Sequence, residues 1–375
     1  MTCQRVADLL AGKTPDRLPW VPELNAGFIR KTTGWRDRGS GESAETLGDA
    51  FGETATDADH LAAEARCAEM IGADHLHRVV SVRTVRHRVR IATDPADGAT
   101  VVHTPAGDLR SRREWDEQSG TMFAREHLIK GPESFAAYQA MVEDETYEPD
   151  YARAEADIAR SGLATVDVPA TPLMHLLMWV MDVQPTLMGI MDYRDAMVDL
   201  MAAMHEKNKE YYRVAAAGAG HILRPMEDAS STLTGPHLYA EHCVGCLNDY
   251  ARICHDAGKV FWTHLCGQLG DMVDVLADVD LDGIEAITPP PLGTADLVVM
   301  RQKLGDIWLV GGVDPSLYAT TSAEGMAEHV REMLGRMRGD RRFMLGHEEI
   351  PRAAKAENVA AVAGLIEGTR EGFYD

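Results

Sequence analysis

The stretch KVFWTHLCGQLGDMVDVLADVDLDGIEAITPPPLG at residues 259–293 decides the fold. It predicts a short strand over 259–264, a helix over about 268–277 and a second strand over 283–287 that ends in a proline-rich turn. Both strands are apolar on both faces, which is typical of a parallel sheet that helices cover on both sides. These residues therefore predict one strand–helix–strand unit of a parallel α/β protein.

The same unit repeats along the chain from about residue 150 onward. Further strands are predicted over 164–168, 221–223, 307–310 and 342–345, with helices near 150–160, 185–217, 236–256, 294–304, 322–338 and 354–368. An early strand at 20–21 and one more strand within 71–105 bring the count close to eight. The pattern predicts a (β/α)8 TIM barrel, and an open doubly wound sheet is the alternative.

The region before residue 150 departs from this repeat. Residues 40–75 have helical spacing, whereas valines alternate with polar residues over 76–115, which predicts a β-hairpin or small sheet. We therefore expect one barrel domain over 1–375 with an N-terminal helical and β-hairpin elaboration at about 30–145.

Charge and composition exclude several classes of function. The chain has 37 Lys and Arg against 59 Asp and Glu, a formal charge of −22, which argues against nonspecific binding to nucleic acid or to an anionic membrane. No run of 18 apolar residues predicts a membrane span, and the first residues do not resemble a signal peptide. Six scattered cysteines do not suggest a disulfide framework. The sequence predicts a cytoplasmic protein with reduced thiols.

In a (β/α)8 barrel the active site lies at the carboxyl ends of the strands, so polar residues that follow strands are the candidates. We expect catalytic roles for Glu227 and Asp167. We expect substrate-binding roles for Asn25, Glu285 and Asp314.

The most specific local feature is His264 and Cys266 at the end of the strand KVFWTH. Residues i and i+2 of a strand point to the same side, so this imidazole and this thiol face one target. Nitrogen and sulfur donors suit Zn²⁺. The alternative is a His and a Cys buried in the barrel core.

A third ligand should come from the end of another strand, and GHEEIP at 346–351 offers two. His347 is the better nitrogen donor, and Glu348 is the alternative. Adjacent strand residues point in opposite directions, so only one should face the barrel axis. The strand residues 343–345 are all apolar and do not fix the phase, so we favour His347 on its chemistry.

Six segments together carry a family resemblance: KTPDRLPWVP at 13–22, WTHLCG at 262–267, DGIEAITPPPLG at 282–293, GGVDP at 311–315, GHEEIP at 346–351 and AENVAAV at 356–362. In these the chain resembles the uroporphyrinogen decarboxylase superfamily, specifically its zinc-dependent methyltransferase branch. The resemblance implies a (β/α)8 barrel and a zinc ion. It also implies methyl transfer between a corrinoid (cobalamin) carrier and a small-molecule acceptor or donor.

Two departures from the family pattern refine this expectation. The arginine-rich stretch that grips porphyrin carboxylates is absent after the first strand, where only Arg30 and Lys31 occur, so porphyrin decarboxylation is not expected. The methyltransferases carry Gly-Cys where this chain has Gly346-His347. A metal-independent decarboxylase or lyase acting on a non-porphyrin carboxylate is the alternative function.

The expected partners follow from the same resemblance. No D-x-H-x-x-G corrinoid-binding signature occurs in the chain, so a corrinoid would arrive on a separate protein. A homodimer is left open.

Overall fold

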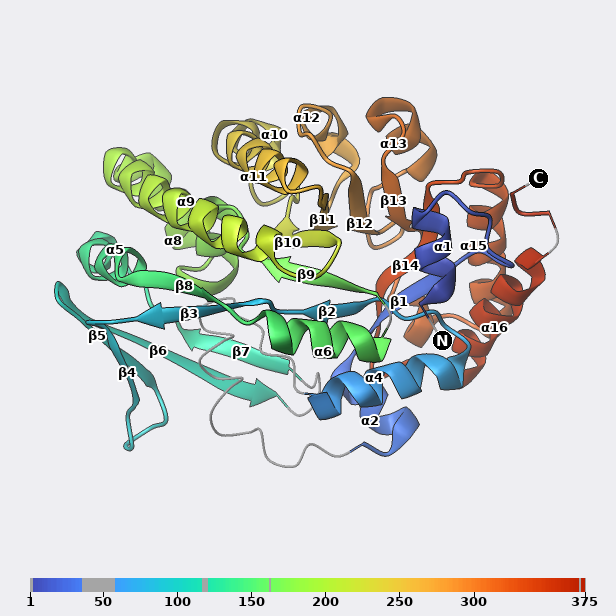
Figure 1. Ribbon diagram of the computed structural model, residues 1–375, viewed down its shortest axis with the longest axis horizontal. Helices are drawn as coiled ribbons and strands as arrows, with labels where there is room; N and C mark the ends of the chain where they lie inside the picture. The colour runs from blue at the N-terminus through green and yellow to red at the C-terminus, as the bar shows by residue number, and fades with distance from the viewer. Residues whose placement is uncertain (1–2, 36–57, 117–120, 162, 371, 375) are drawn as a thin grey trace.

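The computed structural model describes residues 3–35, 58–116, 121–161, 163–370 and 372–374. Eight strands form one curled sheet in the order β1-β14-β13-β12-β11-β10-β9-β2, and each ladder between neighbours is parallel. Their bounds are β1 Trp20–Leu24, β2 His77–Val79, β9 Ala164–Val168, β10 Ile222–Asp228, β11 Val260–Cys266, β12 Gly283–Ile287, β13 Trp308–Gly311 and β14 Phe343–Ile350. This arrangement confirms the predicted (β/α)8 barrel (Figure 1).

The barrel closes between β1 and β2 without a ladder. The Asp74 amide donates to the Trp20 carbonyl at 2.7 Å, and the Asp74 carboxylate accepts from the Trp20 amide at 3.1 Å. Nearer the carboxyl ends of the two strands, Arg78 pairs with Glu23 at 3.0 Å. A few polar contacts therefore close a seam that backbone ladders close elsewhere around the sheet.

Helices follow the strands in the order that the repeat predicts. After β1 come α2 Ala26–Thr33 and α4 Ala58–Ile71; after β9 come α7 Pro172–His175, α8 Val183–Asp192 and α9 Arg194–Ala217; after β10 come α10 Gly235–Tyr239 and α11 Gly245–Asp256. The later helices are α12 Val273–Leu276, α13 Leu297–Leu304, α14 Leu317–Thr320, α15 Ala323–Arg336 and α16 Ala356–Glu367. Two π-helical turns, Leu176–Val180 and Ala240–Val244, extend α7 and α10. The helix expected over 40–75 is present as α4, and residues 40–57 lie outside the described residues.

Two apolar cores hold the barrel. The larger lies between the sheet and its surrounding helices. The smaller fills the interior at the amino ends of the strands and combines Val6 and Leu9 with Val21, Leu76, Ile222, Trp262, Trp308, Val310 and Met344. Val6 and Leu9 come from α1 Gln4–Leu10, so this helix plugs the bottom of the barrel. The opposite end is left for polar side chains.

The elaboration lies between β2 and α6 Tyr151–Ser161. It contains the antiparallel pair of β3 Val82–Arg86 with β8 Glu145–Pro149, helix α5 Phe135–Glu143, and the antiparallel sheet of β4 Arg90–Thr93, β5 Thr100–Thr104, β6 Gly107–Asp116 and β7 Thr121–Glu126. Figure 1 shows this sheet extending away from the barrel. The expected elaboration at about 30–145 also took in α4 and β2, but β2 is a strand of the eight-stranded sheet. The assignment of 1–375 to one domain stays a prediction.

Within the described residues, no helix combines the length and the apolar character that crossing a bilayer requires.

Candidate active site

Alternation along the strands brings polar side chains into the barrel interior above the apolar layer. Ile222 and Trp262 belong to the interior core, and Arg224 and His264 follow them by two residues on β10 and β11. Glu285 of β12 lies beside His264 in the parallel ladder. Because residues i and i+2 of a strand share a face, all three polar side chains point inward.

A β-bulge in β14 directs His347 into the same space. Strands β1 and β14 are in register at Val21 and again at Glu23, but the intervening stretch of β14 is one residue longer. His347 has a φ of 54°, in the left-handed region, and lies within this bulge. The extra residue turns His347 inward while Glu348 faces the helices. Such bulges are common beside active sites because they re-aim a side chain.

Strand β12 carries a matching irregularity. Its register against β13 shifts between Ile284 and Ile287, and Ala286 has a φ of 65°. The irregularity directly follows Glu285. Glu285 and His347 thus both come from strands whose pairing contains a register shift.

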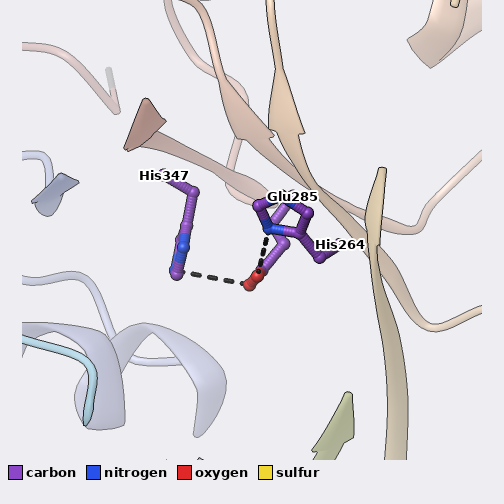
Figure 2. Close-up of side chains that lie close together, drawn as sticks. All are labelled: His264, Glu285 and His347. Carbon is purple, nitrogen blue, oxygen red and sulfur yellow. Dashed lines mark hydrogen bonds and ion pairs between the residues drawn. The ribbon is translucent and has the colours of Figure 1, made fainter. Parts of the chain in front are cut away.

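His264, Glu285 and His347 lie close together in the barrel interior (Figure 2). The Nδ1 atom of His264 is 3.2 Å from Oε1 of Glu285, and Nε2 of His347 is 3.3 Å from Oε2 of Glu285. One ligand atom from each residue lies within 4.8 Å of the other two. Glu285 is fully buried, and both histidines are 6% exposed, so water screens these charges weakly.

Arg224 binds this cluster from β10. Its guanidinium donates from Nε to Oε1 of Glu285, and its Nη2 atom lies 2.8 Å from Nδ1 of His264. Nη1 donates to Asp167 of β9 at 2.9 Å. Arg224 is 1% exposed, and a buried guanidinium needs such carboxylate partners. Arg224 therefore fixes the positions of His264 and Glu285 relative to each other.

The environment shifts the pKa values of the three residues in different directions. Burial alone would lower the pKa of His264, but hydrogen bonds to Cys266 and Glu285 outweigh it and raise the pKa to about 9. Burial lowers the pKa of His347 to about 4, because the charge of Glu285 compensates only in part. Burial would raise the pKa of Glu285, but Arg224 and the two imidazoles hold it below its ordinary value. The carboxylate is thus ionised, and His347 offers a neutral imidazole.

The residues present fit a zinc ion in three respects. Two imidazoles and one glutamate form a donor set known from catalytic zinc sites. Ligand atoms bound to a tetrahedral zinc at about 2.0–2.2 Å are roughly 3.3–3.6 Å apart, and one ligand atom from each of these three residues lies within 4.8 Å of the other two. Both ring nitrogens of His347 and Oε2 of Glu285 are buried without a hydrogen-bond partner. Buried polar atoms normally have one, so these atoms are suited to hold a cation.

Neither of the other two candidate ligands belongs to the group of three that the described residues form. Cys266 hydrogen-bonds to His264, but the group of three does not include its thiol, whose described contact is with the Glu227 carbonyl at 3.7 Å. Glu348 points outward, and its Oε1 accepts from Trp20 Nε1 at 3.2 Å and from the Tyr318 hydroxyl at 2.8 Å. The third member of the group is Glu285, which was expected from the sequence to bind substrate. Metal binding by Cys266 stays a prediction.

Glu227 lies on the opposite face of β10 from Arg224. Its carboxylate accepts from the Thr171 amide at 2.6 Å and from the Thr171 hydroxyl at 2.8 Å, in the layer between sheet and helices. Burial raises its pKa to about 7 although these hydrogen bonds oppose the shift. The expected catalytic pair is therefore split, because Asp167 reaches the cluster through Arg224 and Glu227 does not.

The remaining predicted residues lie around the mouth of the barrel. Asn25 caps α2 by accepting from the Gly27 amide at 2.8 Å, and its amide donates to Glu349 at 3.2 Å. Asp314 uses both carboxylate oxygens within loops, accepting from the Leu292 amide at 2.7 Å and from Ser316. Asn25 thus caps a helix and bonds Glu349, whereas Asp314 holds two loops together, and substrate binding by either residue stays a prediction.

Sequence reasoning missed Arg224. Its signal is a lone charged residue inside the apolar segment HILRPM at 221–226. An arginine within a buried strand requires carboxylate partners, so the segment could have predicted a buried ion-pair network.

These features define the class of protein: a (β/α)8 barrel with a buried imidazole–carboxylate cluster at the carboxyl ends of its strands, where enzymes of this fold place their active sites. The family model for uroporphyrinogen decarboxylase (URO-D) matches residues 169–368. The chain belongs to the uroporphyrinogen decarboxylase family, as its sequence resemblance predicted. No curated protein sequence matches the chain.

One solved structure supports the fold over the whole chain. A methyltransferase from Methanosarcina mazei has a TM-score of 0.60 at 12% identity, covering 100% of this chain and 99% of that one. A Listeria monocytogenes protein described as a vitamin-B12-independent methionine synthase has a TM-score of 0.39 at 15% identity, covering 58% of this chain and 67% of that one. The first similarity extends over the whole barrel and its elaboration.

Proposed function

We propose that this protein is a zinc-dependent methyltransferase that moves a methyl group between a corrinoid carrier and a small-molecule acceptor or donor. One observation carries the proposal: His264, Glu285 and His347 converge inside the barrel, and Oε2 of Glu285 and both ring nitrogens of His347 are buried without a hydrogen-bond partner. Membership of the uroporphyrinogen decarboxylase family and the fold shared with the Methanosarcina mazei methyltransferase support it. The corrinoid would be brought by a separate protein to the mouth of the barrel.

In this proposal His264, Glu285 and His347 hold the zinc, and Cys266 stands beside His264 as a further donor. Bound there, zinc would supply Lewis-acid chemistry that lowers the pKa of the acceptor heteroatom. The protein's own contribution is orientation. Arg224 donates to Oε1 of Glu285 and so restrains that carboxylate, and Asp167 restrains Arg224 from the far side. Such supporting contacts commonly tune metal affinity by about 10–100-fold.

The wall of the barrel beside this cluster suits a polar substrate. Arg78 pairs with Glu23, and Asn25 pairs with Glu349, where β1, β2 and β14 end. These side chains are only partly buried, so they can exchange a protein partner for a substrate group. A small acceptor or donor with hydrogen-bonding groups is therefore the expected substrate class.

The first experiment measures zinc by metal analysis in the purified wild type and in His347→Ala. Glu348→Gln is the matched control, because it is the adjacent residue, it faces outward, and glutamine keeps an acceptor for Trp20 and Tyr318. We expect near-stoichiometric zinc in the wild type and in Glu348→Gln, and an affinity at least 10–100-fold lower in His347→Ala. Loss of zinc from Glu348→Gln with retention in His347→Ala would refute the ligand assignment.

The second experiment tests the reaction. Absorbance spectra of methylcobalamin are followed with candidate thiol acceptors, in the presence of the wild type or of Glu285→Gln. We expect demethylation with the wild type and a strongly reduced rate with Glu285→Gln. Equal rates with the two proteins would refute a role for this site in methyl transfer.

A second candidate function is metal-independent decarboxylase or lyase chemistry on a non-porphyrin carboxylate. The observation that favours it is Arg224, because a buried guanidinium in contact with His264 and Glu285 opposes a second cation. With Arg224 and a protonated His264 against Asp167 and Glu285, the cluster is balanced in charge without a metal. Zinc-free protein that retains full activity on a carboxylated substrate would favour this candidate.

A further inference from the structure

A pocket lies at the opposite end of the barrel from the candidate active site. Its volume is about 150 Å³, and it is lined by Leu9, Leu10, Gly12, Lys13, Thr14, Trp308, Arg341, Arg342 and Tyr374. Trp308 begins β13, and Arg342 directly precedes β14, so the pocket opens where the strands begin. The end of α1 and the turn that follows it form the other wall.

The pocket offers a positive charge that is not neutralised. Arg341 donates from Nη1 to the Thr14 hydroxyl at 3.0 Å, and among the described residues no carboxylate pairs with it. The other two cations of the lining have carboxylate partners: Arg342 pairs with Asp306 at 3.0 Å and lies over the Trp308 ring at 5.4 Å, and Lys13 pairs with Asp8 at 3.5 Å. Arg341 is therefore the group that an anion would meet, in a protein whose overall charge is −22.

Tyr374 supplies a second polar group to the pocket wall. The Tyr374 hydroxyl is buried without a hydrogen bond within the described part of the chain. Buried hydroxyl groups are normally hydrogen-bonded, so this O–H can donate to a bound oxygen atom. Arg341 and Tyr374 thus provide two donors in one small pocket.

Trp308, Leu9 and Leu10 supply the apolar part of the lining. Trp308 is 6% exposed, Leu9 is 3% exposed, and Leu10 packs against the same interior core. A cavity of about 150 Å³ is large enough for one benzene ring. The pocket therefore fits a single ring that carries one small charged group.

We propose that this pocket is a binding site for a small aromatic carboxylate, separate from the active site. The carboxylate accepts hydrogen bonds from Arg341 and Tyr374, and the ring packs between Trp308 and the leucines of α1. An arginine–carboxylate contact gives the site its preference for an anion, because charge-assisted hydrogen bonds are roughly twice as strong as neutral ones. A bound ring also joins α1 to the strands that it plugs, so occupancy should stabilise the fold.

The test uses benzoate as the probe, with its binding to the full-length protein measured by isothermal titration calorimetry and by Trp fluorescence. Benzamide has the same ring and no charge, so it is the matched ligand control. Arg341→Gln removes the charge, Tyr374→Phe removes the hydroxyl, and Arg338→Gln is a control for loss of an exposed arginine.

We expect benzoate to bind the wild type and Arg338→Gln equally and to raise their melting temperatures. Affinity should fall roughly 10-fold or more in Arg341→Gln and about 5-fold in Tyr374→Phe, from the usual free energies of charged and neutral hydrogen bonds. Unchanged affinity in Arg341→Gln, equal binding of benzamide, or no binding of benzoate to the wild type would each overturn the proposal.

Discussion

Gly346→Ala should damage both the stability of the barrel and its metal site. A Cβ atom at position 346 would lie 2.5 Å from the Val21 carbonyl oxygen and 2.6 Å from its carbonyl carbon. Both atoms are backbone, so one of the strands β1 and β14 must move. Gly346 also has a φ of 146°, a conformation that L-residues rarely adopt.

The expected cost combines these two effects. Overpacking costs about 1–3 kcal/mol, and an unfavourable backbone conformation adds about 1–3 kcal/mol, so the free energy of unfolding should fall by about 2–6 kcal/mol. Because Gly346 directly precedes the bulge, displacement of β14 should also move His347 and lower zinc affinity.

Urea unfolding followed by circular dichroism measures the first effect, and metal analysis measures the second. Gly364→Ala in α16 is the matched control, because a Cβ there meets nothing within 4 Å and alanine should stabilise the helix by about 0.5–1 kcal/mol. If Gly346→Ala unfolds within about 0.5 kcal/mol of the wild type, the reasoning from the close approach of β1 is wrong.

Three further predictions concern other parts of the molecule. Asp144 accepts hydrogen bonds from three successive backbone amides at 87–89, so Asp144→Ala should cost about 1–3 kcal/mol in urea unfolding at pH 7. These bonds and Arg88 hold the pKa of Asp144 below its ordinary 3.8, although burial opposes them. The stability that they give is therefore present above pH 3.8 and is lost as the pH falls through the lowered pKa. A difference in unfolding free energy between wild type and Asp144→Ala that persists in strong acid would contradict this. Burial lowers the pKa of His175 from 6.5 to about 4, so the stability given by its neutral, buried imidazole is complete above pH 6.5 and is lost toward pH 4. His175→Phe should therefore reduce the dependence of the unfolding free energy on pH between 4 and 6.5. An unchanged slope in that range would count against the lowered pKa of His175. The chain should release no carbon dioxide from uroporphyrinogen, since Arg30 and Lys31 alone replace the arginine-rich stretch, and measurable release by the purified protein would refute this.

The sequence predicted the barrel because its signal is repetitive. Strand–helix units after residue 150 recur with clear glycine and proline boundaries, and each unit reinforces the others. The second barrel strand was harder to locate, since β2 has only three residues and is followed by a longer antiparallel region with stronger β-patterns. A short strand held by its neighbours leaves little local signal.

The site was predictable only in part, because side-chain direction depends on irregularities that alternation cannot foresee. His264 faces inward as its spacing from Trp262 requires. His347 faces inward only because a bulge inserts one residue into β14, and no pattern in the apolar residues before it reveals that bulge. Glu227 was misplaced for a simpler reason: its partner Thr171 lies 56 residues away, on the outer face of the sheet.

The pairing of β1 with β14 also constrains how the chain acquires its structure. Trp20 and Glu348, joined by a hydrogen bond across these two strands, are 328 residues apart in sequence. At about 5–20 residues per second, a ribosome needs roughly 15–65 s to make the chain between them. Throughout that interval β1 has no ladder partner, because it forms no ladder with β2. Ring closure in this protein is therefore a late, post-translational event, and the newly made N-terminal segment is the part most exposed to aggregation.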